Sequence, residues 1–177
     1  MKMSQTKRLV LSAICLALCV VLPLIFHAVP NGGNIFLPIH IPVLICGLLC
    51  GTVYGTVCGV MGPLLSSLIT GMPPLAYAPS MMVECAVYGL VCGLLMKFIR
   101  TRKPILDLYI SLVCSMLIGR IVAGIAKAVI FTPGISPIAW VASSIVSGIP
   151  GILIQLILIP LLITALTKAG LLGKRYE

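Results

Sequence analysis

Long apolar runs, separated by short loops rich in proline and glycine, are the feature that most constrains this chain. Runs of about 18 or more apolar residues have the length that an α-helix needs to cross the hydrocarbon core of a bilayer, which is about 30 Å thick. The composition agrees, since 60% of the 177 residues are hydrophobic and only 8% are charged, which excludes an ordinary soluble domain. The sequence therefore predicts an all-α membrane protein made of a single domain.

Six membrane-spanning helices are predicted, at about residues 9–29, 39–53, 56–70, 80–99, 105–132 and 138–166. The second and third spans form one apolar block from Ile39 to Thr70, which as a single helix would be about 48 Å long and therefore too long for one crossing. We expect the break between them near Thr52 to Gly55. In the last span Pro150 removes a backbone donor, so the helix is predicted to kink around it.

The basic residues predict how these helices are oriented. The net charge is +9, and ten of the twelve lysines and arginines lie near the N-terminus, between Lys97 and Lys103, or near the C-terminus. Such clusters stay on the cytoplasmic side, so both termini and the 97–103 loop are expected to be cytoplasmic, with an even number of spans between them. No basic face is interleaved with aromatic residues, so no nucleic-acid partner is expected. We expect a multi-pass protein of the bacterial cytoplasmic membrane.

Small residues indicate close packing between helices. The eight cysteines include no C-x-x-C pair and lie in apolar helices, where cysteine packs as a small apolar residue, so neither a metal site nor a disulfide scaffold is expected. Gly47, Gly51, Gly55 and Gly59 repeat every four residues, which lets two helix backbones meet closely. The partner of this glycine ladder is either a helix of the same chain or another subunit.

Three charges lie inside the apolar helices. Glu84 follows the proline-rich loop 71–79 and is the one acidic residue within the hydrophobic body of the chain, whereas Arg120 and Lys127 lie two turns apart on one face of the fifth span. Counted from the outer ends of the helices, Glu84 lies about 6 Å deep, Lys127 about 8 Å and Arg120 about 18 Å. We therefore expect Glu84 to pair with Lys127. Arg120 then needs a backbone carbonyl, Gln155 or a ligand, because an unpaired charge in the membrane is costly. The set is either a structural polar network or one that contacts a ligand.

Enzyme motifs are absent from the sequence, which shows no H-E-x-x-H, no G-x-S-x-G and no paired carboxylates within one helix. We therefore expect neither an enzyme nor a cofactor. His27 and His40 flank the first outer loop without a further ligand at metal-binding spacing, so no metal is expected. A G-x-x-x-x-G-K-[ST] loop is missing as well, so ATP-driven transport would depend on ATPase subunits supplied by other chains.

Several segments together resemble a family of membrane transport subunits. They are FLPIHIPVLICGLLCG (36–51), GPLLSSLITGMPP (62–74), the Met82-Val83-Glu84 run with Tyr88-Gly89, the Gly119-Arg120 pair, and the stretch from Pro150 to Gln155. In these segments, in its length and in its six spans, the chain resembles the substrate-binding S components of energy-coupling factor (ECF) vitamin transporters.

The resemblance implies a division of labour. Spans one to three would face an energising module, composed of a transmembrane coupling subunit and two ATPase subunits, with Ala13 and Ala17 as the docking surface. Spans four to six, with the first and third outer loops, would hold a small vitamin ligand, and the whole subunit would topple in the bilayer to carry it inward. The candidate substrate-binding residues are Asn34, His40, Met72, Tyr77, Glu84, Tyr88, Arg120, Lys127 and Gln155.

The ligand itself stays open between pantothenate, cobalamin and other vitamins. A ligand with one anionic group, such as pantothenate, is slightly favoured, because the charges of Glu84, Arg120 and Lys127 sum to +1 and a guanidinium suits a carboxylate. Two alternatives belong to other classes. One is an autonomous carrier or channel for small solutes, and the other is a membrane scaffold protein that binds no small molecule.

Overall fold

The computed structural model describes residues 3–26, 32–101, 103–170 and 172, and the regular secondary structure within these residues is helical. The described elements are α1 (Gln5–Ile25), α2 (Gly32–Phe36), α3 (His40–Cys50), α4 (Thr52–Thr70), α5 (Ala78–Phe98), α6 (Pro104–Ala126), the π-helical η1 (Lys127–Phe131), α7 (Pro137–Ser147) and α8 (Ile149–Lys168). Six helices in the described part of the chain are long and apolar enough to cross a membrane, with α2 joined to α3 and α6 joined to η1. This confirms the predicted class of fold.

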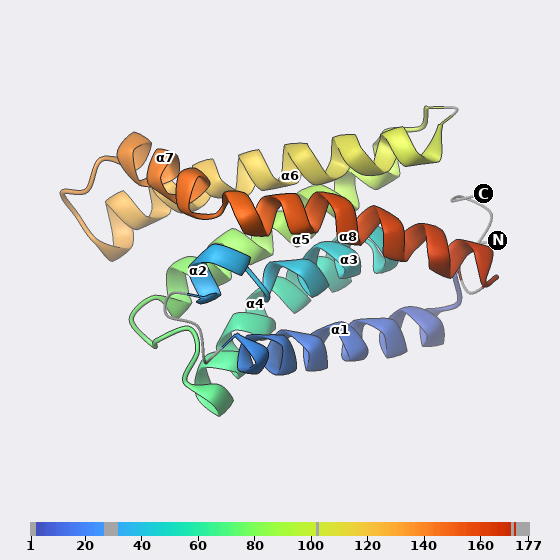
Figure 1. Cartoon of the computed structure of the whole chain (residues 1–177), viewed down its shortest axis with the longest axis horizontal. Coiled ribbons are helices and arrows are strands. Elements are labelled where there is room, and N and C mark those ends of the chain that lie inside the picture. The colour runs from blue at the N-terminus through green and yellow to red at the C-terminus, as the bar shows by residue number, and fades with distance from the viewer. Residues whose placement is uncertain (1–2, 27–31, 102, 171, 173–177) are drawn as a thin grey trace.

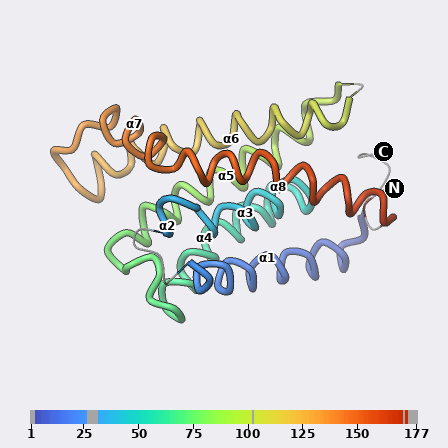
Figure 2. Tube along the Cα trace, in the orientation of Figure 1, coloured from blue at the N-terminus to red at the C-terminus, as the bar shows by residue number. Residues whose placement is uncertain are grey.

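The bundle has two ends, at which different segments of the chain gather. The start of α1, the turn between α5 and α6 and the end of α8 lie at one end of the molecule, on the right of Figure 1. The opposite end carries α2, the α4–α5 loop, η1 and α7, and Figure 2 traces the same path along the backbone. We call this second end the loop end. Which end faces the cytoplasm stays a prediction from the basic residues.

The long apolar block breaks at a glycine. Gly51 has φ +95°, a left-handed conformation that a residue with a side chain rarely adopts, and it separates α3 from α4. The break therefore comes one residue before the predicted segment between Thr52 and Gly55.

The last predicted span differs from the structure. Instead of one kinked helix over 138–166, α7 and α8 are separate helices that meet at Gly148, and α7 is too short to count among the six crossings. Pro150 lies in the first turn of α8, where a backbone N–H has no helical partner in any case. The proline is thus placed at a helix start, where it costs little, and a kink is not needed.

The glycine ladder packs within the chain. A Cβ atom at Gly55 would lie 2.6 Å from Cα of Gly47, and one at Gly47 would lie 2.8 Å from the carbonyl oxygen of Gly89. A Cβ at Gly59 or Gly89 would overlap the backbone of α5 or α4, respectively. The backbones of α3, α4 and α5 therefore meet directly, and we call this contact the glycine junction. Of the two partners considered for the ladder, the structure shows a helix of the same chain.

Cysteines line the inner faces around this junction. Seven of the eight are buried, and Cys15 and Cys19 form the buried side of α1 where it packs on α3 and α4. A Cβ at Gly62 would lie 2.8 Å from the sulfur of Cys19, so α1 also approaches α4 closely. The cysteines therefore serve as small packing residues, as predicted from their apolar setting.

Candidate functional site

Glu84 is the centre of a buried polar cluster near the loop end. It lies on α5 with 8% of its surface exposed, and one turn later Tyr88 donates a hydrogen bond of 2.7 Å from its hydroxyl to Oε1 of Glu84. The ring of Tyr88 fits there because α6 has a glycine opposite, and a Cβ atom at Gly119 would overlap it. The Gly119-Arg120 pair thus combines a gap for the tyrosine with a charge beside it.

Two more side chains approach the same carboxylate oxygen. Nε2 of His40, at the start of α3, lies 3.6 Å from Oε1 of Glu84, and Nε of Arg120, on α6, lies 4.0 Å from it. Both residues are almost fully buried, at 1% and 3% exposure. Helices α3, α5 and α6 therefore meet at one carboxylate. With a neutral imidazole the cluster carries no net charge, since Glu84 and Arg120 balance each other.

The guanidinium of Arg120 also reaches α7. Its Nη1 donates a hydrogen bond of 2.5 Å to the carbonyl oxygen of Ser144. A Cβ atom at Gly148 would lie 3.1 Å from Nη2, so the glycine between α7 and α8 leaves room for the charged group. Of the three partners considered for Arg120, a backbone carbonyl is therefore present.

The predicted pair between Glu84 and Lys127 is wrong. Arg120, and not Lys127, lies level with Glu84, because Gly119 faces the carbonyl oxygen of Glu84 across the α5–α6 contact. Helix α6 continues through η1 to Phe131, so at the loop end of the bundle it projects beyond the start of α5. The predicted depths of Glu84 and Lys127 were counted from the ends of their own helices, which is valid only if the two ends lie at the same level. Lys127 lies about 10 Å closer to the loop end than Arg120 along this helix.

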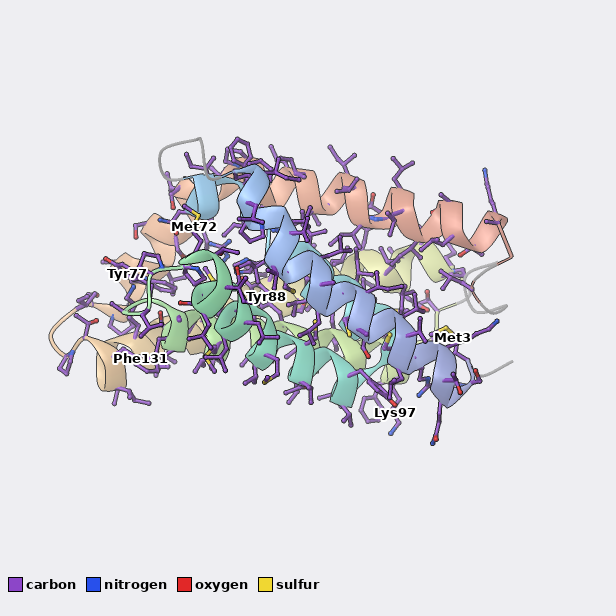
Figure 3. The ribbon with its side chains drawn as sticks, turned by 90° about the horizontal axis from the view of Figure 1, so that it is seen from below. Met3, Met72, Tyr77, Tyr88, Lys97 and Phe131 are labelled. Atoms are coloured by element: carbon purple, nitrogen blue, oxygen red, sulfur yellow. The ribbon has the colours of Figure 1, made fainter. Side chains whose placement is uncertain are left out.

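Lys127 instead contacts two aromatic rings. Its Nζ lies 5.0 Å from the ring centroid of Tyr77 and 5.1 Å from that of Trp140, which are cation–π distances. Tyr77 belongs to the α4–α5 loop and Trp140 to α7. Figure 3 shows Tyr77 at the loop end and Tyr88 further inside, with Lys97 near the opposite end. We call Lys127, Tyr77 and Trp140 the aromatic rim of the site.

Gln155 binds a strained turn. It is 1% exposed on α8, and its Nε2 donates a hydrogen bond of 3.4 Å to the carbonyl oxygen of Leu37. Leu37 has φ +51°, an uncommon conformation for a residue that is not glycine, and it precedes the turn into α3. Gln155 therefore connects α8 to the segment that carries His40.

The remaining candidates lie outside this buried cluster. Asn34 is exposed on α2, and Met72 is half-buried in the α4–α5 loop, where its carbonyl oxygen accepts a hydrogen bond of 2.6 Å from Ser66. Ala13 and Ala17 are exposed on α1. The substrate contacts of Asn34 and Met72 and the docking role of the two alanines stay predictions. His27 lies outside the described residues.

Sequence reasoning missed two members of the site. The carbonyl of Ser144 has no signature in the sequence, because every residue carries one. Trp140 had a signal that was not used, since it is the only tryptophan of the chain and lies near the outer end of the predicted last span. Within the described residues, no group of three or more histidine, cysteine, aspartate and glutamate side chains is placed to hold a metal ion.

The buried cluster is closed as it stands, since its members are at most 8% exposed. Two hollows of the described structure lie toward the opposite end, one between α6 and α8 and the other beside Thr101 and Asp107, and share no residue with the cluster. A ligand that reaches Glu84 must therefore displace the elements of the loop end that cover it.

Comparison with known protein families gives one result that covers most of the chain. Residues 7–163 match the family model described as "ECF transporter, substrate-specific component". Comparisons with curated proteins and with solved structures gave no significant match.

Proposed function

This chain belongs to the family of substrate-specific components of ECF transporters, and we propose that the cluster around Glu84 is where it holds a vitamin or a related micronutrient. Members of this family are integral membrane subunits of importers and not enzymes. They associate with an energising module made of a transmembrane subunit and ATPase subunits. The six apolar helices fit a multi-pass protein of the cell membrane.

The observation that carries the proposal is the burial of ionisable groups from three helices around one carboxylate oxygen. Glu84, His40 and Arg120 are all at least nine-tenths buried within the membrane-spanning part of the chain. Such groups are costly in a bilayer, so an intramembrane cluster is by default a functional site. Both nitrogens of His40 and Nε of Arg120 are buried without a hydrogen-bond partner among the described residues, which leaves donors and acceptors that a polar ligand would satisfy.

Among vitamins, a compound with one acidic group, of which pantothenate is an example, is favoured over a large compound such as cobalamin. The charges of Glu84, Arg120 and Lys127 still sum to +1, which supports the preference for an acid. Arg120 was the expected anchor for that acid, but its charge is balanced by Glu84 and its Nη1 donates to the Ser144 carbonyl. The excess charge is therefore that of Lys127.

We further propose that α1 is the surface that docks on the transmembrane coupling subunit. Cys15 and Cys19 turn toward α3 and α4, whereas Ala13 and Ala17 lie on the exposed side of α1. Two alanines one turn apart let another helix approach closely. Helix α1 contributes no residue to the charged cluster, so docking and ligand binding would be separable.

Two measurements test the proposal. Mass spectrometry of the protein purified in mild detergent should detect a copurifying vitamin-class ligand. Proteoliposomes that contain this chain, the energising module and ATP should then accumulate that ligand, whereas proteoliposomes without the module should not. Uptake in the absence of the module would instead indicate an autonomous carrier. A chain that neither binds a ligand nor supports uptake would be a scaffold.

A further inference from the structure

We propose that Lys127, with the rings of Tyr77 and Trp140 against it, forms an anion-binding subsite at the loop end that takes the acidic group of the ligand. This inference rests on the proposed function, because it assumes that the subunit binds a small ligand there. It assigns the recognition of the ligand's acidic group to the rim of the site, whereas the polar cluster around Glu84 would contact the rest of the ligand.

Charge balance is the first argument. Glu84 is the acidic residue of this region, and Tyr88, His40 and Arg120 already surround its Oε1. Among the described residues no carboxylate oxygen lies within 4.0 Å of Nζ of Lys127. Lys127 therefore carries the uncompensated positive charge at the end of the bundle where the ligand enters.

The hydrogen-bonding state of the ammonium is the second argument. A lysine ammonium has three N–H donors, and a ring face is not a conventional acceptor. Within the part of the chain that the structure describes, the contacts of Nζ are the two rings, at 5.0 and 5.1 Å. Lys127 is half-buried, so solvent reaches it only in part. A carboxylate or phosphate oxygen would supply the acceptors that these donors lack.

The rings are the third argument. Tyr77 and Trp140 come from two segments that are separated in the chain by α5 and α6, yet both lie against the same ammonium. Tyr77 is 56% exposed and Trp140 half-buried, so the rings cover part of the charge from water, and a charge interaction is stronger where water is excluded. The rings also offer flat apolar surface for the part of the ligand next to its acid. A lone surface lysine has neither property.

Lys97 offers a comparison within the same chain. Its Nζ lies 5.7 Å from the ring of Phe98, which is also a cation–π contact, but it is at the opposite end of the bundle, where both residues are exposed. Removal of Lys97 changes the net charge of the protein as much as removal of Lys127 does. It is therefore the matched control.

Trp140 makes the subsite measurable without knowledge of the ligand. It is the only tryptophan in the chain, so tryptophan fluorescence reports on the rim alone. We would compare quenching by iodide, which is an anion, with quenching by acrylamide, which is neutral, in purified ligand-free protein. An anion-attracting lysine raises the local iodide concentration, so the ratio of the iodide to the acrylamide quenching constant should fall about two- to fivefold in Lys127→Met. The ratio should stay at the wild-type value in Lys97→Met and in the charge-conserving Lys127→Arg.

A second measurement addresses the ligand's acid directly. Calorimetry with pantothenate and with its neutral primary amide should show that wild-type protein prefers the acid by about tenfold. Lys127→Met should lose this preference, and Lys97→Met should retain it. An unchanged iodide ratio in Lys127→Met, or an acid preference that survives the substitution, would overturn the subsite. Failure of uptake with the complete energising module would instead contradict the proposed function and leave the quenching result to decide on the subsite.

Discussion

Two regions of this molecule differ in the contacts that hold their helices together. In the glycine junction, the backbones of α3, α4 and α5 touch each other without side chains between them. Around the charged cluster, hydrogen bonds from long polar side chains also link the helices: Arg120 of α6 donates to the carbonyl oxygen of Ser144 in α7, and Gln155 of α8 donates to that of Leu37. The first kind of contact leaves no space to change, whereas the second is made and broken by rotation of a side chain.

The difference suggests how the two regions divide the work. Protein interiors that are close-packed transmit force and resist deformation, so the glycine junction is suited to be the rigid part of the subunit. Helix α8 buries only one residue per turn, namely Gly151, Gln155, Ile159, Ile163 and Thr167, with Pro160 beside them. A ligand that must displace elements at the loop end would move α7 and α8 rather than the junction.

The largest expected effect is the loss of uptake when α1 can no longer dock. Ala13→Leu or Ala17→Leu adds a bulky side chain to the exposed face of α1 and should abolish uptake in proteoliposomes, while ligand binding to the isolated subunit is unchanged. Ala165→Leu, the same substitution at an exposed position of α8, is the matched control and should not affect uptake. If binding fell as much as uptake, the face would belong to internal packing.

The next effect concerns the buried ion pair. Glu84→Gln leaves the guanidinium of Arg120 without its counter-charge and should lower the free energy of unfolding by about 3–5 kcal/mol. Arg120→Met should cost a similar amount. The double variant should be more stable than the sum of the two single losses predicts, because neither charge is then left alone. Denaturant titration in detergent would measure the cycle, and additive losses would show that the two residues are not coupled.

A smaller loss is expected from overpacking the glycine junction. In Gly89→Ala the new methyl group overlaps the backbone of Gly55, so the helices must separate, at a cost of about 1–3 kcal/mol. Gly33→Ala in α2 is the control, since a Cβ there has no heavy atom within 4 Å. Thermal unfolding of both variants would sharpen the comparison of the two regions. An unchanged melting temperature for Gly89→Ala would show that the glycine junction can adjust as readily as the contacts around the charged cluster.

Hydropathy and chain length were sufficient to predict six crossings, because they depend on sums over many residues. The boundary between α7 and α8 was not predicted, because Pro150 is compatible both with a kink and with a helix start. The packing of the neighbouring Gly148 decides between the two, and it is visible only in the structure. The predicted charges are all near the loop end, but their pairing was not predictable. The pairing depends on the axial offset between α6 and α5, and the fit of Gly119 against Tyr88 determines that offset.

The contacts of the cluster show the same limit. His40, Tyr88 and Arg120 were predicted as site residues from a likeness and from the cost of buried charge, and the structure brings them to Glu84. The sequence could not predict Ser144 as the acceptor, because a backbone carbonyl takes part through its position and not through its side chain. Individual polar residues can therefore be proposed from a sequence, but their partners require the relative placement of the helices.

The smallest expected effect isolates the attachment of α8. Gln155→Leu removes the hydrogen bond to the carbonyl oxygen of Leu37, which also accepts from the amide of His40 at 3.1 Å. Because Leu37 has a positive φ, its conformation must be held by surrounding contacts, so the turn should open more easily by about 0.5–1.5 kcal/mol. Hydrogen–deuterium exchange of the peptide that contains His40 would measure this opening.

Thr164→Val is the control for that substitution. Its hydroxyl donates to the carbonyl oxygen of Pro160 within α8 itself, so its loss removes a hydrogen bond of the same helix without releasing another element. Exchange at the α2–α3 turn should be faster in Gln155→Leu and unchanged in Thr164→Val. Equal exchange in both variants would mean that Gln155 does not hold the turn, and that α8 is attached through its apolar contacts alone. In that case the contrast with the glycine junction would rest on the hydrogen bond from Arg120 to Ser144 and not on that from Gln155.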